Sequence, residues 1–389
     1  MKVCVIGSGG REHALAWRLS ISPSVTKVYA IPGSAAMLDC AELVGIDWQQ
    51  SDHLISFLKD NQVDLVVVGP EAPLVAGLAD VLNKAGIPVF GPSKAAAQLE
   101  GSKVFAKDLM KKYNIPTAAY GVFHKVDEAK AFIAQTGAPI VVKADGLAAG
   151  KGVVVAMTID EANVAVEDML SGNRFGDAGS TVVIEEFMEG EEASLLAFVD
   201  GKTVVPMIAS QDHKRIFDGD KGPNTGGMGT YAPAPVLTDA LRDAAMKTIL
   251  EPMVAAMEKE GMPYVGCLYA GLMITDEGPK VVEFNARFGD PETQVVLPLL
   301  DSDLGEIMMA CAKGTLTSNM VKWKDSSAAC VILASKGYPE TSSKGDVISG
   351  DIKQYDTTIV FHSGTKLVGE NYVTNGGRVL GVVGLGKDL

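Results

Sequence analysis

The chain has 389 residues, 47% hydrophobic and 21% charged, which is the balance of a globular protein long enough for two or three domains. Its net charge of −14 argues against nucleic-acid or anionic-membrane binding, because both need a basic surface. No apolar run approaches the ~20 residues that span a bilayer, and the five cysteines form no C-x-x-C pair. These features predict a soluble cytoplasmic protein with reduced thiols and neither a disulfide framework nor a zinc site.

The first hundred residues alternate short apolar runs with helical patterns. This alternation predicts βαβ units and an open parallel sheet, in which ligands bind at the carboxyl ends of the strands. The predicted strands cover residues 2–6, 25–31, 64–68 and 87–90.

From about Ser102 the pattern changes to a mixed α+β region with antiparallel strand pairs. A lysine-rich helix over 103–113 precedes a hairpin formed by 139–143 and 153–156. Longer strands are predicted at 181–186, 193–199, 266–274 and 280–285. A small β-rich module then follows, with predicted strands at 328–335, 358–362 and 378–383.

A glycine-rich loop, Gly7-Ser8-Gly9, follows the first strand and opens a helix. It is not a dinucleotide fingerprint, because Glu12 occupies the third glycine position and no acid ends the second strand. The loop is either a plain tight turn or a site where helix N-terminal amides and Arg11 hold one phosphate. A nucleotide-dependent oxidoreductase is the rival interpretation, which tight NAD(P) binding would support.

A second glycine-rich segment, residues 141–152, separates the two strands of the predicted hairpin. Only three residues lie between Gly146 and Gly150, and Gly152 stands where a Walker A loop has Ser or Thr, so this is not a P-loop. A mobile hairpin that closes over ATP phosphates fits better, with glycine amides near the oxygens and Lys143 and Lys151 neutralising charge. The alternative is a flexible surface hairpin.

The last predicted strand of this region carries the most specific pattern. Its two-residue period places Glu283, Asn285 and Arg287 on one face, with Val282 and Phe284 on the other. Carboxylate and carboxamide oxygens are hard ligands suited to Mg²⁺ that carries triphosphate oxygens. We therefore predict a metal site at Glu283 and Asn285.

A polar cluster, Gln211–Arg215, is followed closely by the glycine-rich stretch 222–229. A charge run alone is usually a solvated face, but this one adjoins a stretch too rich in glycine for a regular element. We expect a loop there that contacts an anion and a substrate.

Together these motifs closely resemble the phosphoribosylamine–glycine ligase family of the ATP-grasp superfamily, over nearly the whole chain. ATP-grasp proteins in general share the Lys143 hairpin and the pair Glu283 and Asn285, whereas the full combination looks like this ligase alone. The motifs of that combination are residues 7–14, 69–74, 211–215, 223–229 and 283–292.

The resemblance implies an N-terminal pre-ATP-grasp α/β domain (1–101), an ATP-grasp domain (102–323) with a mobile lid at about 119–187, and a C-terminal β-rich domain (324–389). It implies that ATP, glycine and 5-phosphoribosylamine become glycinamide ribonucleotide, ADP and phosphate through glycyl phosphate, in purine synthesis. We expect a cytoplasmic monomer or weak dimer that needs Mg²⁺ or Mn²⁺ and binds small molecules only. Another ATP-grasp carboxylate–amine ligase and a non-catalytic ATP sensor remain as alternatives.

The resemblance also implies roles for individual residues. ATP would contact Lys103, Lys143, Gly150, Gly152, Glu185, Glu186, Phe187, Met188 and Glu192, with adenine at 185–188 and ribose at Glu192. The substrates would contact Gly9, Gly10, Glu71, Asp212, Thr225 and Arg287. The catalytic residues would be Arg287, Lys214 and Asp212, and the metal ligands would be Glu283 and Asn285.

Two features depart from the family pattern. Ser34 stands where relatives usually have Asn, which puts one sugar or phosphate contact in question. The sequence ends at Leu389, where relatives continue into a C-terminal helix. Because the residues assigned to chemistry lie upstream, we expect a missing tail to affect stability before mechanism.

Overall fold

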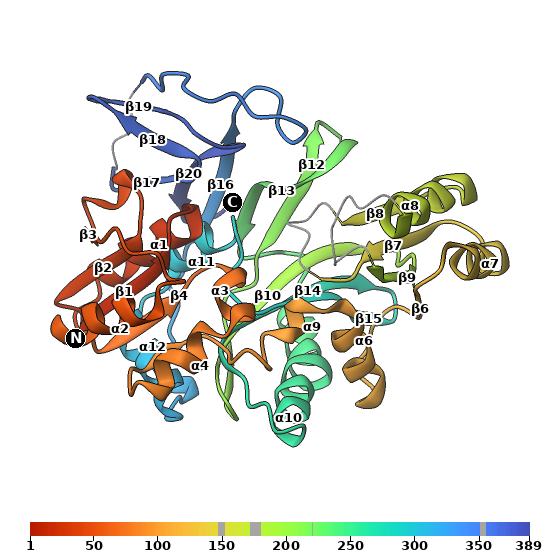
Figure 1. The fold of residues 1–389 in the computed structure, drawn as a ribbon, viewed down its shortest axis with the longest axis horizontal. Coiled ribbons are helices and arrows are strands. Elements are labelled where there is room, and N and C mark those ends of the chain that lie inside the picture. The colour runs from red at the N-terminus through yellow and green to blue at the C-terminus, as the bar shows by residue number, and fades with distance from the viewer. Residues whose placement is uncertain (147–151, 172–179, 220, 351–354) are drawn as a thin grey trace.

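The computed structural model describes residues 1–146, 152–171, 180–219, 221–350 and 355–389. The N-terminal sheet and the lid strands lie at opposite ends of the molecule, with a central antiparallel sheet between them and the C-terminal strands above the N-terminal sheet (Figure 1). Within the described ranges, no helix has both the length and the apolar character that a membrane span requires.

The N-terminal sheet is parallel throughout, with strand order β3-β2-β1-β4-β5, as the alternating pattern predicted. Its strands are β1 (Lys2–Gly7), β2 (Lys27–Pro32), β3 (Glu42–Leu43), β4 (Leu65–Val68) and β5 (Val89–Phe90). Its helices are α1 (Gly10–Ser20), α2 (Ser51–Asp60), α3 (Glu71–Ala76) and α4 (Leu78–Lys84), with a 3-10 turn at Ala35–Met37. β1 is apolar along its length because separate cores cover its two faces.

The central sheet has the order β11-β10-β14-β15 and is antiparallel. Its strands are β10 (Glu191–Asp200), β11 (Val204–Pro206), β14 (Val265–Thr275) and β15 (Gly278–Asn285). The helices of this region are α5 (Gln98–Gly101), α6 (Lys103–Lys112), α9 (Asp239–Ala245) and α10 (Glu251–Lys259), with a π-helical turn at Met246–Leu250. They share one apolar core with β10 and β14.

The lid has a sheet of its own, with order β6-β9-β7-β8. Its elements are β6 (Tyr120–Phe123), α7 (Val126–Thr136), β7 (Ile140–Ala144), β8 (Val153–Ala156), α8 (Ile159–Ser171) and β9 (Val182–Glu186). β7 and β8 form the predicted hairpin, in which Lys143 pairs with Val153. The lid core contains only lid residues, so this unit packs as a separate body; its closure over ATP stays a prediction.

A fourth sheet, of order β12-β13-β16-β20-β17, corrects one expectation. The expected loop over 211–215 and 222–229 is the antiparallel pair β12 (Gln211–Phe217) and β13 (Lys221–Ala232). Glycine weakens a strand, but β13 is held by partners on both sides, and register shifts in its pairing with β12 absorb the irregular sequence.

The C-terminal strands complete that sheet and pack on the N-terminal domain. They are β16 (Ser327–Ala334), β17 (Thr358–His362) and β20 (Arg378–Gly386), next to the hairpin of β18 (Thr365–Val368) and β19 (Asn371–Thr374). The remaining elements are α11 (Thr293–Leu299), α12 (Leu304–Lys313) and a 3-10 turn at Ser318–Met320. One apolar core runs from β1 and α1 through α11 and α12 to β17.

Contact between α1 and the C-terminal strands is close. The His13 Nδ1 accepts the backbone N–H of His362 at 3.0 Å. A Cβ on Gly10 would lie 2.3 Å from Ser363 Oγ, so a larger residue at the start of α1 would have to displace the Ser363 hydroxyl. The N-terminal glycine loop therefore faces the C-terminal module.

Candidate active site

The end of β15 carries the predicted metal residues. Asn285 Nδ2 donates to Glu283 Oε1 at 3.5 Å, and Arg287 Nη2 donates to Asn285 Oδ1 at 3.1 Å. The three polar side chains therefore lie in one row, as the two-residue period predicted.

The opposite face of β15 differs from the prediction. The register against β14 shifts beside Val282, so that the strict alternation is interrupted there. As a result Val281 is buried with Phe284 in the core, while Val282 is only half-buried.

The donor set at Glu283 and Asn285 is small. Among the residues that the structure describes, no group of three or more His, Cys, Asp or Glu side chains could hold a metal ion. One carboxylate and one amide oxygen fit Mg²⁺, which is usually bound through one or two protein groups plus substrate phosphates and water. The residues present therefore fit a metal that arrives with a nucleotide.

The charges of three lysines from separate elements act on the Glu283 carboxylate. Burial alone would raise the pKa of this carboxyl, but the charges of Lys143, Lys214 and Lys103 bring it below its ordinary value. Lys143 Nζ also donates to the carbonyl oxygen of Val282 at 3.0 Å, which joins the lid strand β7 to β15. Lys143 of the hairpin and strand β15, which are distant in sequence, are thus neighbours.

Glu185, at the end of β9, is shared by two buried lysines. Its Oε2 lies 3.0 Å from Lys143 Nζ and 2.9 Å from Lys107 Nζ. Burial lowers the pKa of Lys107 to about 8, against the opposing effect of the Glu185 charge. Glu185 Oε1 is buried and has no hydrogen-bond partner in the described part of the chain, which leaves it free to accept. Lys107 was not among the predicted site residues, and its only signal in the sequence is its position four residues after Lys103 on α6.

Lys103 begins α6 beside the glycine-rich hairpin. Its Nζ donates to the Gly146 carbonyl oxygen at 3.0 Å, and its backbone N–H donates to Asp145 Oδ1 at 2.6 Å. Gly152 comes just before β8, whereas Gly150 and Lys151 lie outside the described residues.

The other predicted nucleotide residues follow the lid strand β9. Glu186 is exposed, and its Oε2 accepts the N–H of Ala119 at 3.4 Å. Phe187 and Met188 are half-buried in the connection from β9 to β10. This segment joins the lid to the central sheet, and its contact with adenine stays a prediction.

Lys214, on β12, joins two predicted acids. Its Nζ lies 2.6 Å from Glu192 Oε2 and 3.0 Å from Asp212 Oδ1. Burial would lower the pKa of Lys214, but these carboxylates raise it well above its ordinary value, so the ammonium stays charged at physiological pH. Thr225 on β13 donates to the Lys214 carbonyl oxygen at 2.8 Å and accepts the Gly227 N–H at 3.0 Å. The structure therefore brings these four predicted residues into one network.

Glu292 is a buried acid to which the sequence analysis gave no role. Its Oε1 accepts the Tyr269 hydroxyl at 2.7 Å and the Ser194 hydroxyl at 3.3 Å. Burial raises the pKa of Glu292, and the charge of Asp212 raises it further. Because its partners come from β14 and β10, only the folded sheet reveals this cluster beside Asp212.

Arg287 lies between two carboxylates of the N-terminal region. Its Nη2 is 2.7 Å from Glu100 Oε1, and its Nε is 3.4 Å from Glu71 Oε2. Burial would lower the pKa of Arg287, but these acids raise it above its ordinary value. The predicted substrate residues Glu71 and Arg287 are thus adjacent, and Glu100 is a partner that the sequence did not indicate.

The N-terminal glycine loop differs from the predicted phosphate site, in which helix amides and Arg11 would hold one phosphate. Several of these donors are already bonded to other groups of the protein. Arg11 is buried, with its Nε 2.6 Å from Glu12 Oε1 and its Nη1 donating to the Phe288 carbonyl oxygen at 3.1 Å. The Gly9 N–H donates to Glu12 Oε2 at 2.7 Å. Glu12, in place of a third glycine, therefore takes up these donors, and Arg11 connects α1 to the loop after β15.

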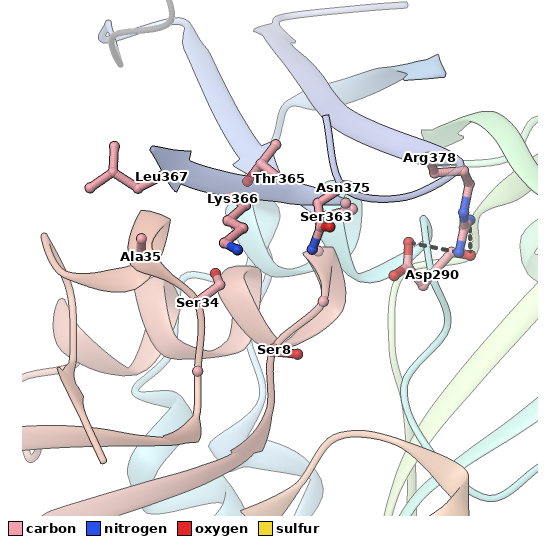
Figure 2. Close-up of a pocket in the computed structure, with 14 residues that line it drawn as sticks. Ser8, Ser34, Ala35, Asp290, Ser363, Thr365, Lys366, Leu367, Asn375 and Arg378 are labelled. Atoms are coloured by element: carbon pink, nitrogen blue, oxygen red, sulfur yellow. Dashed lines mark hydrogen bonds and ion pairs between the residues drawn. The ribbon is translucent and has the colours of Figure 1, made fainter. Parts of the chain in front are cut away.

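A cavity of about 600 Å³ separates this loop from the C-terminal module (Figure 2). Gly9, Gly10 and Ser34 line one side, while Lys366 and Arg378 line the other. Lys366 extends toward Ser34, whose hydroxyl has no hydrogen-bond partner among the described residues. A cation and a free hydroxyl in a polar cavity suit a phosphorylated sugar. Neither Lys366 nor Arg378 belongs to a motif that is recognisable in the sequence.

Family models and full-length relatives agree on what the chain resembles. Phosphoribosylglycinamide synthetase models match as the N domain over residues 1–100, the ATP-grasp (A) domain over 101–293 and the C domain over 328–389. A phosphoribosylamine–glycine ligase of Halalkalibacterium halodurans is 55% identical over 380 residues, 98% of this chain and 88% of the relative. The chain belongs to the phosphoribosylamine–glycine ligase family. The ligase of Vibrio cholerae, 53% identical over 393 residues, covers 100% of this chain and 92% of its own.

Solved structures agree with that family. The crystal structure of a phosphoribosylamine–glycine ligase of Thermotoga maritima matches with a TM-score of 0.86 and 33% identity, covering 100% of this chain and 93% of its own. The biotin carboxylase domain of Hydrogenobacter thermophilus 2-oxoglutarate carboxylase, solved with MgADP, matches with a TM-score of 0.77 and 17% identity, over 100% of this chain and 86% of its own. The second likeness shows a shared fold alone. The predicted family and its multidomain ATP-grasp fold are confirmed.

Proposed function

We infer that the chain is an ATP-dependent ligase that joins glycine to 5-phosphoribosylamine, giving glycinamide ribonucleotide, ADP and phosphate in purine synthesis. The convergence of Lys143, Lys103 and Lys214 on Glu283 carries this inference, in a chain whose three domains match one ligase family. Such a cluster of cations around one acid suits the phosphates and metal of ATP.

ATP would bind between the lid and the central sheet. Lys103 and Lys143, with the hairpin glycines Gly150 and Gly152, would face its phosphates. The segment 185–188 would contact adenine, which the unpartnered Glu185 Oε1 supports because it can accept from the adenine amino group. Glu192 would accept from the ribose hydroxyls.

Glu283 and Asn285 would hold Mg²⁺ or Mn²⁺ with the phosphates. When bound, the metal supplies Lewis-acid stabilisation of the phosphoryl oxygens. The lowered pKa of Glu283 keeps this ligand ionised at neutral pH. Asn285 Oδ1 is oriented by Arg287, so the arginine positions a metal ligand as well as facing the substrate.

The first chemical step brings two anions together, the glycine carboxylate and the γ-phosphate of ATP. Lys214 and Arg287 would neutralise that charge, while Asp212 and Thr225 would orient glycine beside them. The product, glycyl phosphate, hydrolyses in water, so the lid would exclude solvent until the amine attacks. None of these steps needs a covalent intermediate on the enzyme.

The amine substrate would occupy the cavity between the N-terminal loop and the C-terminal module. Gly9 and Gly10 allow close approach, and Lys366 with the Ser34 hydroxyl would hold its phosphate. Glu71 is paired with Arg287 and so would lie between the cavity and the site of phosphoryl transfer.

An omission experiment tests the function. ADP and ligated product are measured with ATP, Mg²⁺, glycine and phosphoribosylamine, the last supplied by condensing ribose 5-phosphate with ammonia. We expect product only with all four components, and one ADP for each product. ADP release without glycine, or binding of ATP without any turnover, would support another ligase or an ATP sensor instead.

The assembly and location follow from the same proposal. The net charge of −14 and small-molecule substrates suit a cytoplasmic enzyme that works as a monomer or weak dimer. Sedimentation at working concentration measures the oligomeric state directly.

A further inference from the structure

Arg378, the first residue of β20, extends from the C-terminal module to strand β13 and to the loop after β15. Its Nη1 donates to the carbonyl oxygens of Gly226 at 2.7 Å, Gly227 at 3.4 Å and Asp290 at 2.7 Å. Its Nη2 lies 3.4 Å from Asp290 Oδ1, and the two side chains are only 20% and 17% exposed. One guanidinium thus holds three backbone carbonyls and one carboxylate.

The part of β13 that receives Arg378 leaves no room for a side chain. A Cβ on Gly226 would lie 3.0 Å from Arg378 Cζ, tighter than an ordinary contact. Gly227 has a φ of +114°, and a Cβ there would lie 2.5 Å from Pro291 Cδ. The glycines of β13 therefore let the guanidinium come close.

Asp290 extends the connection to the N-terminal domain. Its Oδ2 accepts the backbone N–H of Arg11 at 3.4 Å, and its Oδ1 accepts from Gln294 at 2.9 Å. Burial would raise the pKa of Asp290, but the charges of Arg378 and Arg11 keep it below its ordinary value. The carboxylate is therefore ionised and bonded to three parts of the chain.

Arg378 and Asp290 lie between the proposed sites of two substrates, the amine and glycine. Arg378 and Asp290 line the cavity that faces the N-terminal loop, and Figure 2 shows them joined at one end of it. Gly227, on the other side, donates to the Thr225 hydroxyl, which is bonded to Lys214 in the proposed glycine site. The guanidinium thus connects the wall of the amine cavity to the strand that would position glycine.

We propose that Arg378 is a positioning residue that keeps the amine of the acceptor aligned with the acyl phosphate. This proposal rests on the proposed function. In the aligned site the amine nitrogen attacks the acyl carbon, the bond from that carbon to the phosphate oxygen breaks, phosphate leaves with the electron pair, and the nitrogen loses a proton to solvent. In a misaligned site water attacks the same carbon, and ATP is consumed to regenerate glycine.

The test measures ligated product per ADP for wild type, R378Q and R378K with all substrates saturating. We expect one product per ADP for wild type, at least a fivefold lower ratio for R378Q with ADP release within about threefold, and partial rescue by R378K. The control R242Q removes a half-buried surface arginine that pairs with Asp239 and should keep the wild-type ratio. D290N, which removes the charge partner, should also lower the ratio and serves if R378Q does not fold.

A ratio of one in both R378Q and D290N would overturn the proposal, even with a raised KM for the amine. That result would assign Arg378 to binding of the acceptor or to stability alone. A wild-type protein that makes no product would instead refute the proposed function, so the two failures are distinguishable.

Discussion

Lys214 Nζ lies 2.6 Å from Glu192 Oε2, so the proposed ribose acid is bonded to the proposed catalytic lysine. Glu192 is exposed on β10, whereas Lys214 is on β12 and also contacts Asp212. The proposed nucleotide and glycine sites therefore share one ammonium group. A substitution at Glu192 should therefore affect both the proposed ATP site and the proposed glycine site.

E192Q should raise the KM for ATP about tenfold, because a hydrogen bond to a charged group contributes roughly 1.5 kcal/mol. The change also removes a charge that raises the pKa of Lys214, although Asp212 keeps the ammonium protonated at neutral pH. The measurement is steady-state kinetics with ATP varied. E258Q, at an exposed residue 3.6 Å from Lys202, is the control, and an unchanged KM for ATP in E192Q would contradict the ribose role.

E283A should lower kcat at least 10³-fold, equivalent to about 4 kcal/mol of transition-state stabilisation, because it removes the carboxylate on which the charges of three lysines act. The fold should survive, since Glu283 contributes no part of the apolar core. The matched control is E277A, at the exposed turn of the same hairpin, whose partner is Lys280. Near-normal activity of E283A with an unchanged Tm would refute the metal assignment.

Lys107 should make the free energy of unfolding depend on pH in the alkaline range. Its pKa is about 8 in the folded chain and 10.5 when unperturbed, so between these values the unfolded chain binds more protons. The free energy of unfolding should therefore gain up to about 1 kcal/mol per pH unit from this group as pH rises from 8 to 10.5.

Urea unfolding of wild type and K107M at pH 7.5, 8.5 and 9.5 measures that contribution. We expect the wild type to gain stability relative to K107M across the series. The control is K112M, at an exposed lysine on the same helix beside Glu260. Its free energy of unfolding should depend on pH as that of the wild type does. A parallel pH dependence of wild type and K107M would show that Lys107 has an ordinary pKa.

T225V should raise the KM for glycine about tenfold or more, because it leaves the Gly227 N–H and the Lys214 carbonyl without their shared partner. An unsatisfied buried polar group costs about 1–3 kcal/mol. T225S keeps the hydroxyl and should stay within about twofold of wild type. Equal glycine kinetics for T225V and T225S would remove Thr225 from the glycine site.

Short-range patterns in the sequence determined much of this protein. Apolar runs between helical segments predicted the parallel sheet, and the period of β15 placed Glu283, Asn285 and Arg287 on one face. These inferences succeeded because strand periodicity and hairpin spacing are local properties of the chain.

Only the tertiary structure decided which distant segments meet. β12 and β13 join the sheet of the C-terminal strands, and Lys366 and Arg378 reach a cavity opposite Gly9, although hundreds of residues separate them in sequence. The pKa of Lys107 likewise depends on tertiary contacts, because burial lowers it while the charge of Glu185, 78 residues further along the chain, opposes that shift. Such pairings follow from long-range packing and desolvation, which no local pattern of residue types encodes.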